Sequence, residues 1–325
     1  MPRKPRESIA RHILPVGTPI GENGTIVTYS ELDIFRQCPL KHRWAYDLLM
    51  TKEQGVGSLL AKGTLWHLVM ETYYYTLATS TATPEQAAEY AAQRHLLDDQ
   101  GEFISTDAEL ISWMLEGYIE FYGRDPGWET LAVELSGMHP LGLLHPSTPP
   151  SGPQIWLQYK IDMLVKDVSG RIWIVDHKTA SAFSQQTEID LDDQFGLYTS
   201  ALRLAGIPVF GFIRSDARTQ RNKGPMKLED RFRRVPTHRT DIELLNIRED
   251  ALNTARLMRA ERPANVSSPD PRQCVWKCDF LQAHLMYRKT NRAKRSEVGI
   301  LEGFGFAPRE LRHREYEANY PPVLA

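Results

Sequence analysis

The chain has little cysteine, no long apolar run and almost no net charge, and each of these features excludes a class of protein. Three cysteines in 325 residues exclude a disulfide-stapled scaffold and are typical of a reducing compartment, where thiols are free, catalytic or bound to metal. No apolar run reaches the roughly 18 to 20 residues of a membrane span. The basic N-terminus lacks the apolar stretch of a signal peptide. We therefore expect a cytoplasmic protein with no membrane partner.

The net charge of −2 comes from 39 basic and 41 acidic residues and argues against a simple polycation that coats nucleic acid. The charges are unevenly distributed, however. Residues 85–134 carry twelve acidic and two basic side chains, whereas residues 214–239 carry nine basic and three acidic ones, and a second basic cluster follows at 288–295. The pattern leaves open whether the basic stretches bind phosphate or form solvated faces.

Hydrophobic periodicity predicts a helical N-terminal half and a mixed α/β second half. The predicted parts are a leader at 1–27, a helical region with a first core strand at 28–136, a proline-rich loop at 137–153, an α/β core at 154–262, and a cysteine-containing segment with a tail at 263–325. Helices are expected over 31–49, 58–77, 84–98, 107–122, 191–205 and 241–259. Strands are expected over 131–135, 155–165, 171–179 and 209–214, the middle two forming a hairpin. We expect one composite domain.

Two carboxylates and an amine are expected to meet at one edge of this hairpin. Asp162 lies on the polar face of its first strand, and Asp176 and Lys178 lie two residues apart near the end of the second, so they project to the same side. Carboxylates bind Mg²⁺ or Mn²⁺, and a lysine beside them can orient water or help to deprotonate it, which is the equipment for phosphodiester hydrolysis. A surface hairpin in which Asp176 simply pairs with Lys178 explains the same triplet.

Five short segments place further chemistry-bearing residues around this hairpin in a fixed order: 30–32 with 35–39, 63–67, 159–164, 174–179 and 194–198. Together they resemble the PD-(D/E)XK nuclease superfamily, and within it the RecB-type domain shared with AddB and with the iron-sulfur nucleases of CRISPR adaptation. The resemblance implies a restriction-endonuclease-like core with a mixed central β-sheet flanked by helices. It extends from Ser30 to about His284, which is most of the chain.

The resemblance also assigns roles to individual residues. It makes His67, Asp162 and Asp176 metal ligands, adds the backbone carbonyl of His177, and makes Lys178 the catalytic lysine. From the residues alone, a lone helical histidine such as His67 is more often a packed core residue.

A glutamate and a glutamine–tyrosine pair complete the set. Glu134 matches a family glutamate that precedes the hairpin, although it is equally explained as surface charge. Gln194 and Tyr198 share a helix face and match a pair that contacts DNA in the family; Tyr198 is otherwise explained as a cover for the hairpin. The chain departs from the family in two places, with Tyr159 where a glycine is usual and His177 where an aromatic residue is usual.

The three cysteines resemble the cluster-binding residues of the iron-sulfur members. Cys274 and Cys278 lie in the C-terminal segment and Cys38 is the distant first ligand, but His284 stands where a fourth cysteine is expected. Histidine can replace cysteine at an iron, and three cysteines with one histidine also suit zinc. We expect a [4Fe-4S] cluster first, with zinc or an empty site as the alternative.

These residues together predict a Mg²⁺- or Mn²⁺-dependent deoxyribonuclease, more an exonuclease than an endonuclease, that acts on single strands or free DNA ends. The chain lacks a glycine-rich phosphate loop, so duplex unwinding requires a helicase or another recombination or CRISPR partner. Its size resembles stand-alone members of phages, which would act in the host cytoplasm. The alternatives are a catalytically silent regulator that binds DNA or protein, and a sequence-specific restriction enzyme.

Overall fold

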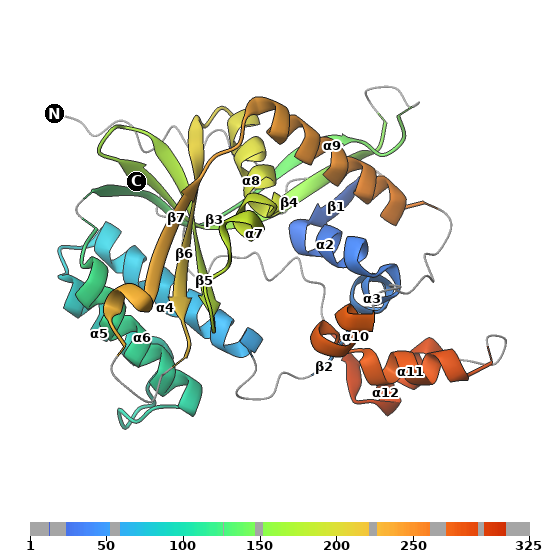
Figure 1. Ribbon diagram of the computed structural model, residues 1–325, viewed down its shortest axis with the longest axis horizontal. Helices are drawn as coiled ribbons and strands as arrows, with labels where there is room; N and C mark the ends of the chain where they lie inside the picture. The colour runs from blue at the N-terminus through green and yellow to red at the C-terminus, as the bar shows by residue number, and fades with distance from the viewer. Residues whose placement is uncertain are drawn as a thin grey trace.

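A six-stranded mixed sheet forms the centre of the protein (Figure 1). The computed structural model describes residues 13, 24–52, 59–125, 127–146, 152–220, 226–260, 271–291 and 296–309. The strand order is β1-β4-β5-β6-β7, and β3 pairs with the other edge of β4. The strands are β1 (Thr25–Thr28), β3 (Trp128–Leu143), β4 (Gln154–Asp167), β5 (Ile172–Ala180), β6 (Val209–Arg218) and β7 (Phe232–Thr237). The predicted mixed α/β core is confirmed.

The sheet forks at the middle of β4. One edge of β4 pairs with β3 in antiparallel register along nearly its whole length. On the other edge, residues 155–158 pair with β1 in parallel and residues 163–166 pair with β5, while no described strand pairs with residues 159–162. Strand β5 pairs in parallel with β6 along its whole length, but its pairing with β4 ends at Val175. The fork therefore opens a gap between β4 and β5 inside the sheet.

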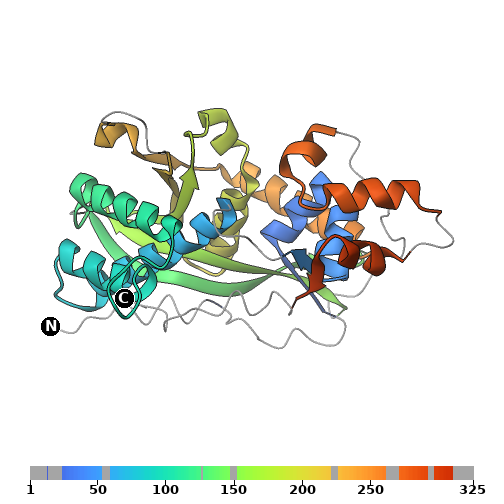
Figure 2. The same cartoon turned by 90° about the horizontal axis from the view of Figure 1, so that it is seen from below.

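Helices cover both faces of the sheet and create two apolar cores (Figures 1 and 2). One face is covered by α4 (Leu59–Thr79), backed by α5 (Pro84–His95) and α6 (Thr106–Tyr122). The other face is covered by α8 (Asp193–Leu204), α9 (Asp241–Met258) and α2 (Tyr29–Gln37), with the short α7 (Gln186–Asp190) before α8. None of the helices in the described part of the chain has the length and apolarity to cross a membrane.

The side chains of β3 change sides of the sheet at Glu134. Residues two apart in a strand normally face the same way, yet Val133 packs in the core beneath α4 and Leu135 packs in the core beneath α8. Glu134 lies between them with φ of 51°, in the left-handed region that a non-glycine residue rarely adopts. The turn of the backbone at Glu134 thus reverses the alternation beside the fork.

The two ends of the described chain share a third core (Figure 1). Its N-terminal part is α3 (Pro39–His42), the π-helix η1 (Arg43–Asp47) and β2 (Met50–Lys52). Its C-terminal part is α11 (Leu281–Lys289), α12 (Glu297–Gly303) and β8 (Phe306–Pro308), which pairs with β2. The short helix α10 (Pro271–Lys277) precedes α11. Leu40, Trp44 and Met50 bury themselves against Phe280 and Tyr287. The C-terminal segment is therefore anchored to the N-terminal helices.

Several sequence-based boundaries are wrong. Strand β3 continues to Leu143, so residues 137–143 are not part of a loop; Pro140 is tolerated because the ladder is irregular between Pro140 and Gly142. Residues 25–27, assigned to the leader, form most of β1. The helix expected over 31–49 breaks at Cys38, directly before Pro39.

The remaining differences concern elements that the sequence did not reveal. Strand β7, the short 3₁₀ helix η2 (Leu228–Asp230) and the three C-terminal helices were not expected. The predicted leader before residue 24, apart from Ile13, and parts of the loop, basic stretches, linker and tail lie outside the described residues, at 147–151, 221–225, 261–270, 292–295 and 310–325.

Much of the basic stretch 214–239 is used inside the protein. Arg234 is largely buried, and its guanidinium binds both carboxylate oxygens of Asp125 and donates to the hydroxyls of Tyr74 at 3.2 Å and Tyr118 at 2.8 Å. Arg239 donates to the backbone oxygens of residues 189 and 190. These arginines hold elements together, so they are not the phosphate contacts that the charge pattern suggested.

Replacing Arg234 should reveal this structural role. We expect Arg234→Met to lower the free energy of unfolding by about 3–5 kcal/mol, because it leaves the Asp125 carboxylate buried without its partner. The double variant Arg234→Met/Asp125→Asn should cost less, since asparagine tolerates the φ of 55° at this position and carries no charge. Urea denaturation measures both. A cost below about 1 kcal/mol for the single variant would contradict this role.

Candidate active site

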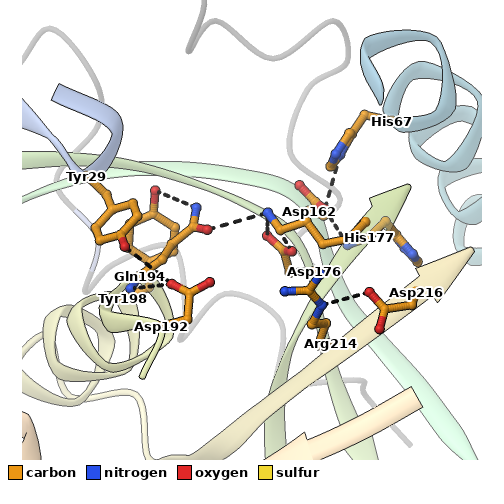
Figure 3. Close-up of polar contacts among 11 residues, drawn as sticks. Tyr29, His67, Asp162, Asp176, His177, Asp192, Gln194, Tyr198, Arg214 and Asp216 are labelled. Carbon is orange, nitrogen blue, oxygen red and sulfur yellow. Dashed lines mark hydrogen bonds and ion pairs between the residues drawn. The ribbon is translucent and has the colours of Figure 1, made fainter. Parts of the chain in front are cut away.

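Asp162 occupies the fork of the sheet and joins three elements there (Figure 3). Its Oδ2 accepts the backbone N–H of His177 on β5 at 2.7 Å and lies 3.1 Å from Nδ1 of His67 on α4. The bond to His177 takes the place of the β4–β5 ladder just where that ladder ends at Val175. One carboxylate therefore bridges the gap between the strands and holds His67 over it.

Asp176 and Lys178 face this gap from β5. The Nζ of Lys178 lies 3.0 Å from Oδ1 and 2.8 Å from Oδ2 of Asp176, and 3.4 Å from Oε1 of Gln194 on α8. Both side chains continue the face of Ile174, as the alternation predicted. The pairing of Asp176 with Lys178 is present, but it lies in the site and not on a free surface, because Asp176 is only 8% exposed.

His67, Glu134 and Asp162 form a group that fits a metal ion. One ligand atom of each lies within 4.8 Å of the others. Glu134 is buried, so the surface-charge interpretation is wrong, and its carboxylate also pairs with Lys160 on the neighbouring strand. Carboxylate oxygens with one imidazole suit Mn²⁺ and Mg²⁺. The left-handed backbone at Glu134 is what brings this third ligand to the fork.

The pKa values reflect the crowding of charge at the fork. Burial alone would raise the pKa of Asp162, but the combined effect of His67, followed by His177 and Lys178, holds this pKa well below its usual range. Burial raises the pKa of Asp176 to about 6, although Lys178 opposes the shift. Burial would lower the pKa of His67, but the neighbouring Asp162 carboxylate raises it above its ordinary value. Burial would also lower the pKa of Lys178, but Asp176, followed by Asp162, raises it. Lys178 is therefore a cation at neutral pH.

His177 fills the place of the usual aromatic residue. Its ring points away from the metal group and stacks on Tyr74 of α4, with ring centroids 5.6 Å apart and an interplanar angle of 19°. Burial lowers the pKa of His177 to about 3, so the ring is neutral and packs as an aromatic group would. The histidine ring therefore packs where the family has an aromatic ring, and the backbone N–H of His177 still lies at the fork, where it donates to Asp162.

Tyr159 is accommodated by a glycine on the neighbouring strand. Gly137 lies opposite Tyr159 in the ladder, and a Cβ on Gly137 would stand 2.6 Å from the Tyr159 hydroxyl. The family usually has a glycine at position 159. Here the tyrosine side chain at this position fits because Gly137, opposite it in the ladder, has no side chain. Gly63, by contrast, needs no special room, since a Cβ there would make an ordinary 3.6 Å contact with Thr179.

The pair Gln194 and Tyr198 adjoins the site from α8. The Nε2 of Gln194 donates to the Tyr198 hydroxyl at 3.4 Å, while the ring of Tyr198 is buried against Tyr159. Two partners were missed from the sequence: Asp192 caps α8 by accepting the backbone N–H of Gln194, and the hydroxyl of Tyr29 donates to Asp192 at 3.4 Å. The cap was readable, because an aspartate precedes a helical run.

The cysteines gather at the junction of the two chain ends. Cys38 lies between α2 and α3, Cys274 lies in α10, and Cys278 precedes α11; none forms a disulfide. Burial raises the pKa of Cys278, and the nearby thiols of Cys274 and Cys38 add to the shift. His284 on α11 meets Trp44 edge-on, with ring centroids 6.3 Å apart. The three predicted cysteines therefore lie near one another.

Comparison with known proteins identifies the family. A family model described as the PD-(D/E)XK nuclease superfamily matches residues 26–282. The chain belongs to this superfamily. Membership implies a nuclease that uses divalent metal ions and acts on DNA, and the match covers the fork, both faces of the sheet and the cysteines.

No curated protein matches the chain. A solved chain titled "Crystal structure of SSO0001" shares 13% sequence identity with a TM-score of 0.37, over 89% of this chain and 94% of that chain.

Metal binding should depend on pH through the fork. Below about pH 6 Asp176 is protonated, and His67 is also protonated over an extended range, so a metal ion must displace protons. We expect the affinity for Mn²⁺ to rise by up to about tenfold per pH unit for each proton released, first as Asp176 loses its proton near pH 6 and then as His67, whose pKa lies above its ordinary value, loses its own. Calorimetric titration measures this. An affinity that stays flat as the pH rises, or that Asp176→Asn leaves unchanged, would contradict the assignment.

Proposed function

We propose that this protein is a Mg²⁺- or Mn²⁺-dependent DNA nuclease of the RecB type that degrades DNA from free ends or single strands. The observation that carries the proposal is the fork, where His67, Glu134 and Asp162 converge beside the Asp176–Lys178 pair. A simple surface ion pair between Asp176 and Lys178 would not need His67, Glu134 and Asp162 beside it. A catalytic centre for phosphodiester hydrolysis would use all five of these side chains.

The residues of the fork have distinct roles in this proposal. A divalent ion held by His67, Asp162, Asp176 and Glu134, with the carbonyl of His177, would supply activation of water and charge stabilisation. Lys178 is held as a cation by Asp176, so it stabilises the negative charge that develops on the phosphate.

Gln194 fixes the lysine from the side of α8. Its Oε1 lies 3.4 Å from Nζ of Lys178, and its amide faces the hydroxyl of Tyr198. Gln194 is partly exposed, so it is the member of the pair that is placed to contact the DNA backbone, with the Tyr198 hydroxyl behind it.

Two other functions use the same fold differently. A silent regulator would bind DNA without metal, would still bind it after Asp162→Ala, and would cleave nothing. The complete set of acids and lysine at the fork favours an enzyme. A restriction enzyme would cut at one sequence, so degradation of random-sequence DNA speaks against it.

We also propose a [4Fe-4S] cluster on Cys38, Cys274, Cys278 and His284, with zinc as the second choice. The cluster would reinforce the core that already joins the N-terminal helices to α11 and α12. Its role would be structural, at a distance from the fork. In recombination, repair, or phage or CRISPR DNA processing, a separate helicase would supply unwound strands.

Lys178→Ala tests the catalytic assignment. Loss of the only cation bound to Asp176 in the described part of the chain should lower the rate of DNA digestion by about 10²–10³-fold. End-labelled single- and double-stranded DNA, with Mg²⁺ or Mn²⁺, provides the assay. Lys166→Ala is the matched control, since Lys166 also lies on the hairpin but pairs with the exposed Glu129.

The outcomes of this assay separate the alternatives. Equal digestion by the wild type and Lys178→Ala under every metal would show that the lysine is wrongly assigned. Closed circular single strands should resist the wild type, because an exonuclease needs an end; rapid cutting of circles would make it an endonuclease.

Anaerobic purification tests the cluster. We expect a broad visible absorption and about four iron atoms per chain, both lost in Cys278→Ala. His284→Cys should keep the iron, whereas His284→Ala should lose part of it. A colourless protein with one zinc ion would overturn the cluster in favour of zinc.

A further inference from the structure

Arg214 stands beside the catalytic pair on the next strand. Strands β5 and β6 are parallel, and their register places Arg214 opposite Asp176 and Asp216 opposite Lys178. Side chains alternate along both strands, and Ile174 and Phe212 pack in the same core, so all four polar residues project to the same side. Figure 3 shows Arg214 directly next to Asp176.

Asp216 holds Arg214 in place. The Nε of Arg214 donates to Oδ1 of Asp216 at 2.7 Å, and Nη2 of Arg233 donates to Oδ2 at 2.9 Å. The Asp216 side chain is fully buried and both its oxygens are occupied, so it orients arginines and is not a further metal ligand. The two arginines and one aspartate leave a net positive charge at this point.

The terminal amino groups of Arg214 remain available. Only Nε bonds to Asp216, and no described residue accepts a hydrogen bond from Nη1 or Nη2. The side chain is only 13% exposed, so its position is fixed by packing as well as by Asp216. A planar guanidinium that is held at Nε, with no acceptor among the described residues for its two terminal amino groups, matches the two free oxygens of a phosphodiester.

We propose that Arg214 binds a phosphate of the substrate strand next to the phosphodiester that is cleaved. This inference rests on the proposed nuclease function and names a substrate-binding residue that lies outside the metal group. Asp216 and Arg233 are the positioning residues behind it. The alternative is that Arg214 only neutralises Asp216 and never touches DNA.

The salt dependence of DNA binding distinguishes these roles. The assay uses a fluorescent single-stranded oligonucleotide, Mn²⁺, and the Lys178→Ala protein, with and without Arg214→Ala. If Arg214 contacts a phosphate, the slope of log affinity against log salt should decrease in magnitude by about 0.7. With Lys178 intact, Arg214→Ala should lower kcat/KM by about 10–100-fold. Arg171→Ala is the matched control, because Arg171 also pairs with an aspartate but lies at the hairpin turn.

A second variant guards against misfolding. Arg214→Gln/Asp216→Asn removes the cation together with the buried charge that orients it, and it should reproduce both effects. An unchanged slope in a folded variant overturns the phosphate contact, even if the rate falls. If the wild type neither binds nor cleaves DNA, the nuclease function itself is contradicted. If the wild type cleaves DNA and the Arg214 variants bind and cleave it equally well, only the role of Arg214 is contradicted.

Discussion

The structure depends on the way in which the Asp162 carboxylate closes the fork of the sheet. Strand β4 can pair with β1 and β5 on the same edge only if the two partners occupy different halves of it, which leaves a gap between them. An open gap would expose backbone N–H groups of β5 without partners. Asp162 satisfies one of them, at His177, and at the same time faces His67. Structural and chemical demands therefore meet in one buried carboxylate.

Two kinds of arginine surround this centre, and their partners separate them. Arg234 is enclosed by a carboxylate, two tyrosine hydroxyls and the faces of Tyr122 and Trp128, so its charge is used entirely within the protein. Arg214 is held at Nε by Asp216, and no described residue accepts a hydrogen bond from its terminal amino groups. A local excess of basic residues in the sequence does not distinguish these two cases, because the distinction lies in the acceptors that the fold supplies.

The sequence predicts the centre of this protein better than its periphery. Asp162, Asp176 and Lys178 were predictable because strand alternation and local spacing place them together, and the family pattern adds His67 and Glu134. The continuation of β3 past Pro140 was not, since an irregular ladder tolerates proline where the local sequence indicates a loop. Strand β7 and the C-terminal helices depend on tertiary partners. The space that Gly137 leaves for Tyr159 depends on strand register, which no single segment reveals.

The most direct test is the position of a bound metal ion in crystals soaked with Mn²⁺, located by its anomalous scattering. The ion should lie at the fork, about 2 Å from side-chain atoms of His67, Glu134, Asp162 and Asp176. Soaked crystals of Asp162→Ala should show no ion there. An ion that binds elsewhere, or that contacts neither Asp162 nor Asp176, would contradict the placement of the catalytic centre.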